Sequence, residues 1–179
     1  MKLPAKYQWL YNEGAPKMLV EAIKHYGILE KPGKGSTVDI TNWAKEVGVS
    51  GWYNDDDIPW CGLFVGVVAK RCGYPFPASK LLAAREWINW GVPVTPGREM
   101  LWDVLVFSRS GGGHVGFYVG ENEKAYLVYG GNQSNAVGFA WIDKSRLLGA
   151  RRPAYRIGEP DNVRKIALNY TGELSRNEA

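Results

Sequence analysis

The chain has 179 residues and a mass of 19.9 kDa, and 45% of its residues are hydrophobic, with 8 Trp and 10 Tyr among them. This composition excludes a disordered chain and predicts one globular domain with a substantial core. The formal net charge of +4 and the pI of about 9.0 suit an anionic polymer such as a bacterial wall or a nucleic acid. Because Lys and Arg are scattered and no nucleic-acid-binding motif is present, we expect only a modest electrostatic bias and no nucleic-acid partner.

The N-terminal residues 1–14 lack the continuous apolar segment of a signal peptide. No run elsewhere is apolar over a length that could span a bilayer. The sequence therefore predicts a soluble protein without membrane insertion, and a monomer is the expected state.

Two helices are predicted before residue 50. Residues 15–26 place apolar side chains at helical spacing, and His25 falls in the last turn, where a polar tip facing solvent is common. After a loop, a second helix is expected to begin at Asp39 or Thr41 and to end at Gly48. No chemistry is assigned to either helix.

Cys61 stands at the start of the most apolar helix that the sequence predicts. Pro59 fits the first turn of a helix, and Asp56 or Asp57 can cap the free amides there. The segment that follows is apolar nearly all round and ends at Gly73, a natural residue after a helix C-terminus. We therefore expect a buried helix with a cysteine in its first turn.

A cysteine at a helix N-terminus lies near free amides and the positive end of the helix dipole, which favour thiolate over thiol. The alternative for Cys61 is the ordinary one of a small buried hydrophobic residue. His114, at the start of a predicted strand, favours the first reading, because a single Cys with a distant His is typical of cysteine hydrolases. This hypothesis requires the two side chains to meet at a cleft that solvent can reach. Cys72, at the far end of the same helix, then has no disulfide partner.

A third helix is predicted over residues 80–91, where Trp87 and Trp90 fit the core better than a cleft wall. Strands are predicted downstream, with short hairpin-like connections that favour an antiparallel meander. Helices followed by strands indicate an α+β fold. The predicted strands span residues 103–108, 114–119, 125–129, 137–142 and, as a possible fifth, 147–151.

The acidic run Asp55, Asp56 and Asp57 has three readings: helix capping, a cation site, or contact with ammonium and amide groups of a peptide substrate. Calcium prefers spaced oxygen ligands with a bidentate carboxylate, so capping is favoured and Asp57 is kept only as a secondary site candidate. The two Cys and two His lack the spacing of a zinc site. The glycine run precedes a strand, so it does not form a phosphate-binding loop, which follows a strand and precedes a helix. We expect no metal and no cofactor.

Several motifs occur in order across residues 7–153: PWCGLFV, WINWG, WDVLVFSRSGGGHVGFYVGE, YLVYGGNQSNAVGF and SRLLGARRP. Together they resemble a phage-associated, endolysin-like branch of the NlpC/P60 and CHAP superfamily of cysteine peptidoglycan hydrolases. The resemblance implies a papain-like α+β fold in which the nucleophile helix packs on a small antiparallel sheet. It places the catalytic domain, with its N-terminal helices, in residues 1–153 and leaves residues 154–179 as a peripheral tail, either a helix or a partly disordered end.

The expected mechanism is an acyl-enzyme on Cys61, with His114 as the general base and acid. A third group should orient the imidazole, and Asn132, at the end of the strand after the histidine strand, is our choice, with Gln133 as the alternative. Many CHAP relatives carry a glutamate two residues before an asparagine, whereas this chain has Gly130 there. Trp60 and Gln133 are secondary candidates for substrate contact.

The resemblance implies cleavage of amide bonds in the stem peptide of bacterial peptidoglycan or at its junction with the glycan. An endolysin-like enzyme without a signal peptide would be made in the host cytoplasm and reach the wall through a holin lesion, in a virion or through a secretion apparatus. A secreted antibacterial amidase effector, a non-catalytic phage tail or wall-binding module, and acyl transfer to an amine are the alternatives.

Overall fold

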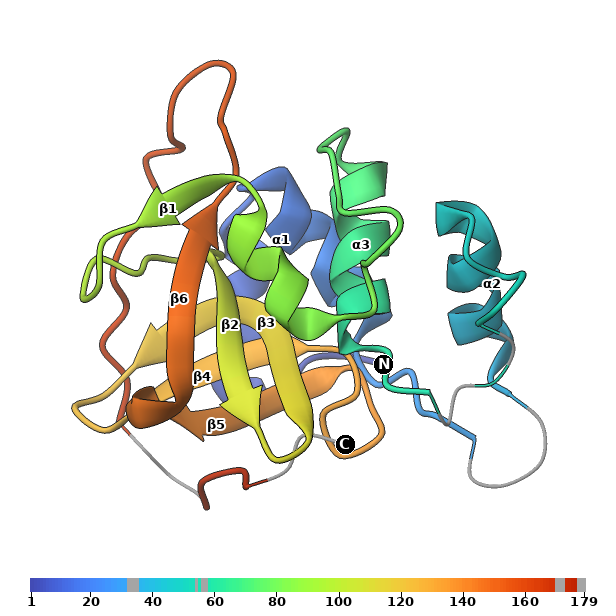
Figure 1. The fold of residues 1–179 in the computed structure, drawn as a ribbon. Helices are drawn as coiled ribbons and strands as arrows, with labels where there is room; N and C mark the ends of the chain where they lie inside the picture. Colours follow the sequence, from blue (N-terminus) through green and yellow to red (C-terminus); the bar gives the residue numbers. More distant parts are fainter. Residues whose placement is uncertain (32–35, 54, 56–57, 170–172, 177–179) are drawn as a thin grey trace.

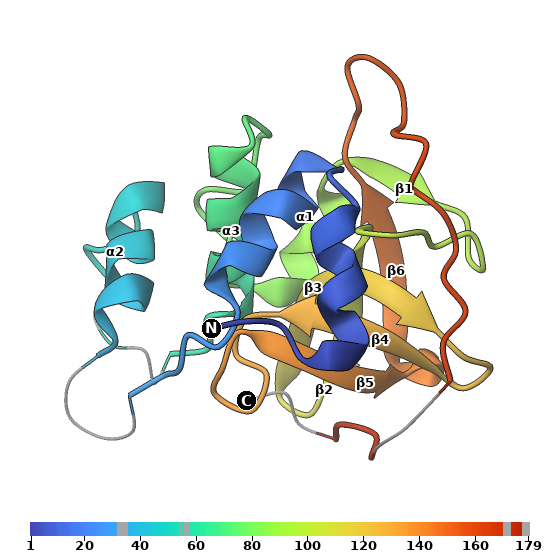
Figure 2. The same ribbon diagram turned by 180° about the vertical axis from the view of Figure 1, so that it is seen from behind.

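The computed structural model describes residues 1–31, 36–53, 55, 58–169 and 173–176. In this part of the chain, helices precede a six-stranded antiparallel sheet with the strand order β1-β6-β2-β3-β4-β5, so the α+β prediction is confirmed. Figures 1 and 2 show the helices gathered beside one face of the sheet. The elements are η1 (Ala5–Asn12), α1 (Lys17–Ala22), η2 (Ile23–His25), α2 (Val38–Val47), α3 (Cys61–Arg71), η3 (Ala84–Asn89), β1 (Val92–Val94), β2 (Val104–Arg109), β3 (Gly112–Glu121), β4 (Ala125–Gly130), β5 (Gly138–Asp143), η4 (Lys144–Arg146) and β6 (Leu147–Arg152).

The helix that carries Cys61 has the predicted character and a slightly later start. It begins at Cys61 rather than at Pro59, and Trp60, which precedes it, supplies no capping side chain. Every residue from Cys61 to Ala69 is buried, which explains why the segment is apolar all round. Gly73 follows the helix with φ of 77° and donates its N–H to the Lys70 carbonyl at 3.0 Å, as predicted for this position.

The other predicted helices differ in length. The first is shorter than predicted, because α1 passes into the 3-10 turn η2, whereas α2 is confirmed and ends before Gly48 at φ of 86°. The prediction of an α-helix over residues 80–91 is wrong, since only η3 forms there. The Leu81 carbonyl instead accepts a 2.9 Å bond from the Trp87 indole and lies against Gly62 of α3. Trp87 and Trp90 are in the core, as predicted.

The five predicted strands are present as β2 to β6, and β2 to β5 form an antiparallel meander. The meander does not continue, because β6 returns across the sheet to pair with β2. Two elements were not predicted from the sequence: η1, and the three-residue β1, which pairs with β6 at the edge of the sheet. Apolar clusters cover both faces of the sheet, so its central strands are buried on both sides.

The tail forms no helix among the described residues after Arg152, so the helical one of its two expected forms is not found there. It runs beside the end of β3 in an extended form. Glu121 donates its N–H to the Ile166 carbonyl and accepts a bond from the N–H of Leu168, each at 2.8 Å. Val163 is buried, so the tail packs on the domain.

A buried ion pair joins the start of β2 to the end of β6. Arg152 donates from Nε and Nη2 to the two carboxylate oxygens of Asp103, each at 2.8 Å, and the Met100 N–H donates to the same carboxylate. The Asp103 side chain is only 1% exposed. Burial raises the pKa of Asp103 although the bonds from Arg152 lower it, which shows how costly this charge is to desolvate.

Replacing Arg152 with Met should therefore lower the free energy of unfolding by about 3–5 kcal/mol, because it leaves the Asp103 carboxylate buried without its cation. Urea denaturation measures this change. The double variant Asp103→Asn, Arg152→Met should recover part of the loss, since it removes both charges. A single-variant loss below about 1 kcal/mol, the range of an exposed pair, would show that the pair behaves as a surface contact.

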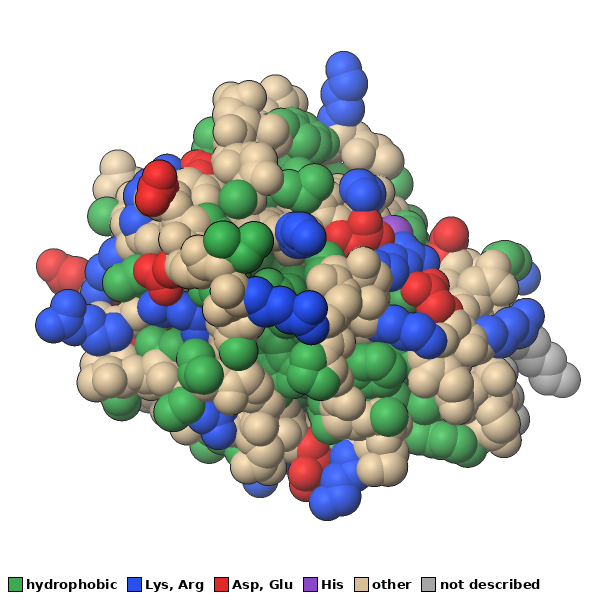
Figure 3. All heavy atoms as spheres, turned by 90° about the horizontal axis from the view of Figure 1, so that it is seen from above, with side chains coloured by type: hydrophobic (Ala, Val, Ile, Leu, Met, Phe, Trp, Pro, Cys, Tyr) green, Lys and Arg blue, Asp and Glu red, His purple; other side chains and the backbone are tan. Residues whose placement is uncertain are grey.

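On the face seen in Figure 3, Lys and Arg side chains are spread over the surface, with acidic and apolar side chains between them. This distribution agrees with the modest electrostatic bias expected from the scattered basic residues. Within the described ranges, no helix is both long and apolar enough to cross a membrane.

Candidate active site

Cys61 lies where the start of α3 meets the sheet and the loop after β4. Glycine is required on both sides of this contact. A Cβ at Gly62 would lie 2.0 Å from the Leu81 carbonyl oxygen, and a Cβ at Gly131 would lie 2.6 Å from Phe64. The loop that carries Asn132 and Gln133 can therefore approach the start of the helix closely.

The thiol of Cys61 lies against the strand that carries His114. The backbone amides of Val115, one residue beyond the histidine, and of Cys61 and Gly62 at the helix start lie near enough to the thiol to lower its pKa. Burial raises the pKa of the thiol, although these amides and the charge of Arg109 lower it. The expected preference for thiolate is thus wrong for this state, because desolvation outweighs the helix N-terminus. The placement of Cys61 beside the histidine strand is as expected.

His114 is oriented by Gln133. The His114 Nε2 lies 3.1 Å from the Gln133 Oε1, and both groups are buried. The Gln133 Nε2 donates to the carbonyls of Val128 at 3.2 Å and Gly138 at 2.5 Å, so both of its hydrogens are engaged. The Oε1 must then accept from His114, which assigns the proton to Nε2 and leaves Nδ1 as the basic nitrogen.

The side-chain oxygen of Asn132 does not accept a hydrogen bond from His114. Asn132 adopts a left-handed conformation with φ of 54°, and its side-chain oxygen is buried without a hydrogen-bond partner among the described residues. Of the two amide residues considered from the sequence, the structure therefore brings Gln133, the alternative, to the imidazole and not Asn132.

Of the remaining candidates, Trp60 is not placed for substrate contact. Trp60 is fully buried and donates its indole N–H to Glu30 at 2.8 Å. Asp57 lies outside the described residues. His25 lies between Glu21 and Arg71, with its Nε2 at 3.1 Å and 2.9 Å from them. These contacts give His25 a structural explanation, as expected.

The hypothesis of a catalytic pair requires Cys61 and His114 to be reachable by solvent, and this structure does not meet that condition. Cys61 is 2% exposed and His114 is fully buried. Any chemistry at this pair therefore needs the covering residues to move before a substrate can reach the sulfur.

Arg109 was missed as a site residue. It ends β2 opposite Gly112, next to the tight turn formed by Ser110 and Gly111, and its charge acts on the Cys61 thiol. The hairpin register places Arg109 on the strand beside His114. The glycine run after Arg109 predicts a tight hairpin, and this pattern could have indicated that Arg109 lies on the strand beside His114.

Both cysteines are free thiols, as expected. Within the described part of the chain, no group of three His, Cys, Asp or Glu side chains is arranged to hold a metal ion. The chemistry that the described groups offer is proton transfer and nucleophilic attack by sulfur.

Comparisons with family models, with curated proteins and with solved structures found no match to this chain.

Proposed function

We propose that this chain is a cysteine amidase with a papain-like arrangement, which hydrolyses amide bonds of the peptidoglycan stem peptide or of its junction with the glycan. The observation that carries the proposal is the placement of the Cys61 thiol beside the Val115 amide of β3, next to His114, whose Nε2 lies 3.1 Å from the Gln133 Oε1. A cysteine at a helix start, a histidine on the strand beside it and an amide that fixes the histidine tautomer are the parts that thiol-based amide hydrolysis needs. The motif resemblance supports peptidoglycan as the substrate.

In the proposed reaction, Nδ1 of His114 takes the proton from the Cys61 thiol, and the thiolate attacks the amide carbonyl carbon. The backbone N–H groups of Cys61 and Gly62, which lower the pKa of the thiol, would also stabilise the oxyanion. The imidazolium then gives its proton to the departing amine as the C–N bond breaks, leaving a thioester. Water, deprotonated by Nδ1, attacks the thioester, and the acid product leaves as the thiolate is reprotonated.

Purified peptidoglycan digested with the protein tests this proposal directly. Mass spectrometry of the products should reveal one new amine terminus and one new carboxyl terminus, which also identifies the bond. A product carrying an added amine in place of water would assign acyl transfer. Intact peptidoglycan after prolonged digestion would contradict the proposal.

A non-catalytic wall-binding or phage tail module of the same architecture is the second candidate. The complete burial of His114 and the raised pKa of the Cys61 thiol favour it. Binding of the protein to peptidoglycan without the release of any new amine or carboxyl terminus would support this second candidate.

Arg109 should shift the pH dependence of the reaction. Its positive charge stabilises the thiolate and lowers the pKa of the Cys61 thiol, against the larger effect of burial. In Arg109→Gln, the thiol pKa should rise, so the increase of kcat/KM with pH should move to higher pH. A pH–rate profile at low ionic strength measures this, and Arg98→Gln, an exposed arginine elsewhere, is the control. Identical profiles for the two variants would remove Arg109 from the site.

A further inference from the structure

Residues 81–85, which we call the cover segment, contact the neighbours of both reacting residues. At one end, the Leu81 carbonyl oxygen lies 2.0 Å from the position of a Cβ at Gly62, the residue after the cysteine. At the other end, the Arg85 Cγ lies 2.8 Å from the position of a Cβ at Gly113, the residue before the histidine. The cysteine and the histidine are both buried, so the cover segment is part of what closes them off from solvent.

The two ends of the cover segment are held by contacts of different strength. The Leu81 side chain is fully buried, and its carbonyl accepts the Trp87 indole N–H at 2.9 Å. Arg85 is exposed, and its Nε donates to the Gly112 carbonyl at 2.9 Å. Because water competes for both partners, the loss of such an exposed hydrogen bond changes an equilibrium only about fivefold. The Arg85 end can therefore open at a small cost in free energy while the Leu81 end stays in place.

Two guanidinium groups adjoin Gly112. Arg85 binds its carbonyl, and Arg109 lies opposite it in the hairpin register, where its charge acts on the cysteine thiol. Neither arginine forms an ion pair with any carboxylate that the structure describes. Glu86, which follows Arg85, is paired instead with Lys80 at 3.5 Å. The approach to the cysteine at this hairpin is therefore cationic and favours an anionic ligand.

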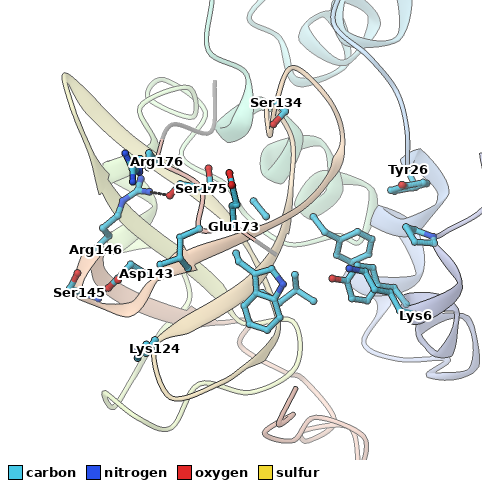
Figure 4. Close-up of a pocket in the computed structure, with 17 residues that line it drawn as sticks. Lys6, Tyr26, Lys124, Ser134, Asp143, Ser145, Arg146, Glu173, Ser175 and Arg176 are labelled. Atoms are coloured by element: carbon cyan, nitrogen blue, oxygen red, sulfur yellow. Dashed lines mark hydrogen bonds between the residues drawn. The ribbon is translucent and has the colours of Figure 1, made fainter. Parts of the chain in front are cut away.

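Arg146 lies near the same hairpin but is already bound. Its Nε donates to the Ser108 carbonyl and its Nη1 to the Ser175 carbonyl, each at 3.0 Å. Figure 4, a view of the groove between β5 and the tail, shows the second of these bonds, with the guanidinium directed toward the tail. Of these three arginines, Arg85 and Arg109 are thus the two whose charge is available to a ligand.

We propose that Arg85 latches the cover segment over the cysteine and that a carboxylate of the substrate releases it. A carboxylate accepts charge-assisted, bidentate hydrogen bonds from a guanidinium, and these are stronger than the bond to a neutral carbonyl. An anionic substrate therefore exchanges the contact of Arg85 with Gly112 for a contact with itself and frees the cover segment. This inference rests on the proposed function and specifies its substrate class, an amide with a free carboxylate near the scissile bond. Arg85 is then a specificity-determining residue.

Alkylation of Cys61 by iodoacetamide and by iodoacetate tests both parts of the inference, because the two reagents differ in carrying a neutral amide or a carboxylate. In each reaction the C–S bond forms as the C–I bond breaks, iodide leaves, and the thiol proton passes to the buffer. The parent protein for these measurements carries Cys72→Ala, so that Cys61 is its one thiol. All rates are measured at one pH and one ionic strength.

Arg85→Ala should raise the rate with iodoacetamide about fivefold, because the latch is lost. It should also lower the ratio of the iodoacetate rate to the iodoacetamide rate about threefold, because the guanidinium no longer attracts the carboxylate. Arg98→Ala, which removes an exposed arginine elsewhere, is the matched control and should leave the rate and the ratio unchanged. Melting curves compare the stability of the variants. The ratio divides out the frequency of opening, so it tests selection even where a variant is less stable.

A faster iodoacetamide reaction with a lower ratio in Arg85→Ala, and neither change in Arg98→Ala, supports the inference. An iodoacetamide rate equal to that of the parent would show that Arg85 does not hold the cover segment. An unchanged ratio would show that Arg85 does not select carboxylates, and either result overturns the inference. The proposed function is read separately, from new termini in digested peptidoglycan. Cleavage without these changes in alkylation rejects only the latch, and the changes without cleavage reject only the amidase.

Discussion

Replacing Cys61 with Ala is expected to abolish the release of new termini from peptidoglycan, by a factor of about 1,000 or more, because no other group can form the acyl-enzyme. The fold should survive. Removing one buried sulfur costs about 1 kcal/mol, so the melting temperature should fall by only a few degrees. Rates of amine release, measured with the melting curve of the same sample, test both parts.

Cys72→Ala is the matched control for this variant. Cys72 follows the C-terminal end of the same helix and is only partly buried, so its loss removes a thiol without touching the site. We expect this variant to retain its activity. If Cys61→Ala kept more than about 1% of the rate while Cys72→Ala lost it, the nucleophile would have been assigned to the wrong sulfur.

The elements that could be predicted from the sequence are those whose signal is local. The apolar run after Cys61 and the left-handed glycine Gly73 define α3 within the chain itself. Segments held by distant partners could not be predicted. Residues 80–91 carry a helical pattern, but the close approach of Leu81 to Gly62 and the Trp87 indole stops an α-helix from forming.

At the candidate site, the sequence predicted that Cys61 would lie beside the strand of His114, but it did not predict the surroundings of these two residues. The loop after β4 has left-handed residues at Asn132, Ser134 and Asn135, so strand alternation does not predict which amide faces His114. The pKa of the thiol depends on the burial of Cys61, and a local sequence pattern does not predict this burial. For this reason the helix-dipole argument predicted the wrong direction for Cys61.

Gln133→Ala should lower kcat by about 100-fold or more, because the imidazole loses the acceptor that fixes its productive tautomer. KM should change little, since Gln133 acts through His114 as a positioning residue and not on the substrate. Nitrogen chemical shifts of the His114 imidazole provide an independent reading. The wild-type protein should show the Nε2–H tautomer, and the variant a mixture of the two.

The control for this variant is Asn132→Gly. It removes the neighbouring amide and keeps the turn, because glycine adopts the φ of 54° without strain. Activity close to wild type is expected. Gln133→Ala will also lose stability, since the carbonyls of Val128 and Gly138 lose their donor, so its rate must be measured well below its melting temperature. An unchanged rate in Gln133→Ala together with a large loss in Asn132→Gly would return the orienting role to Asn132. It would also mean that the loop rearranges when the buried pair opens to substrate.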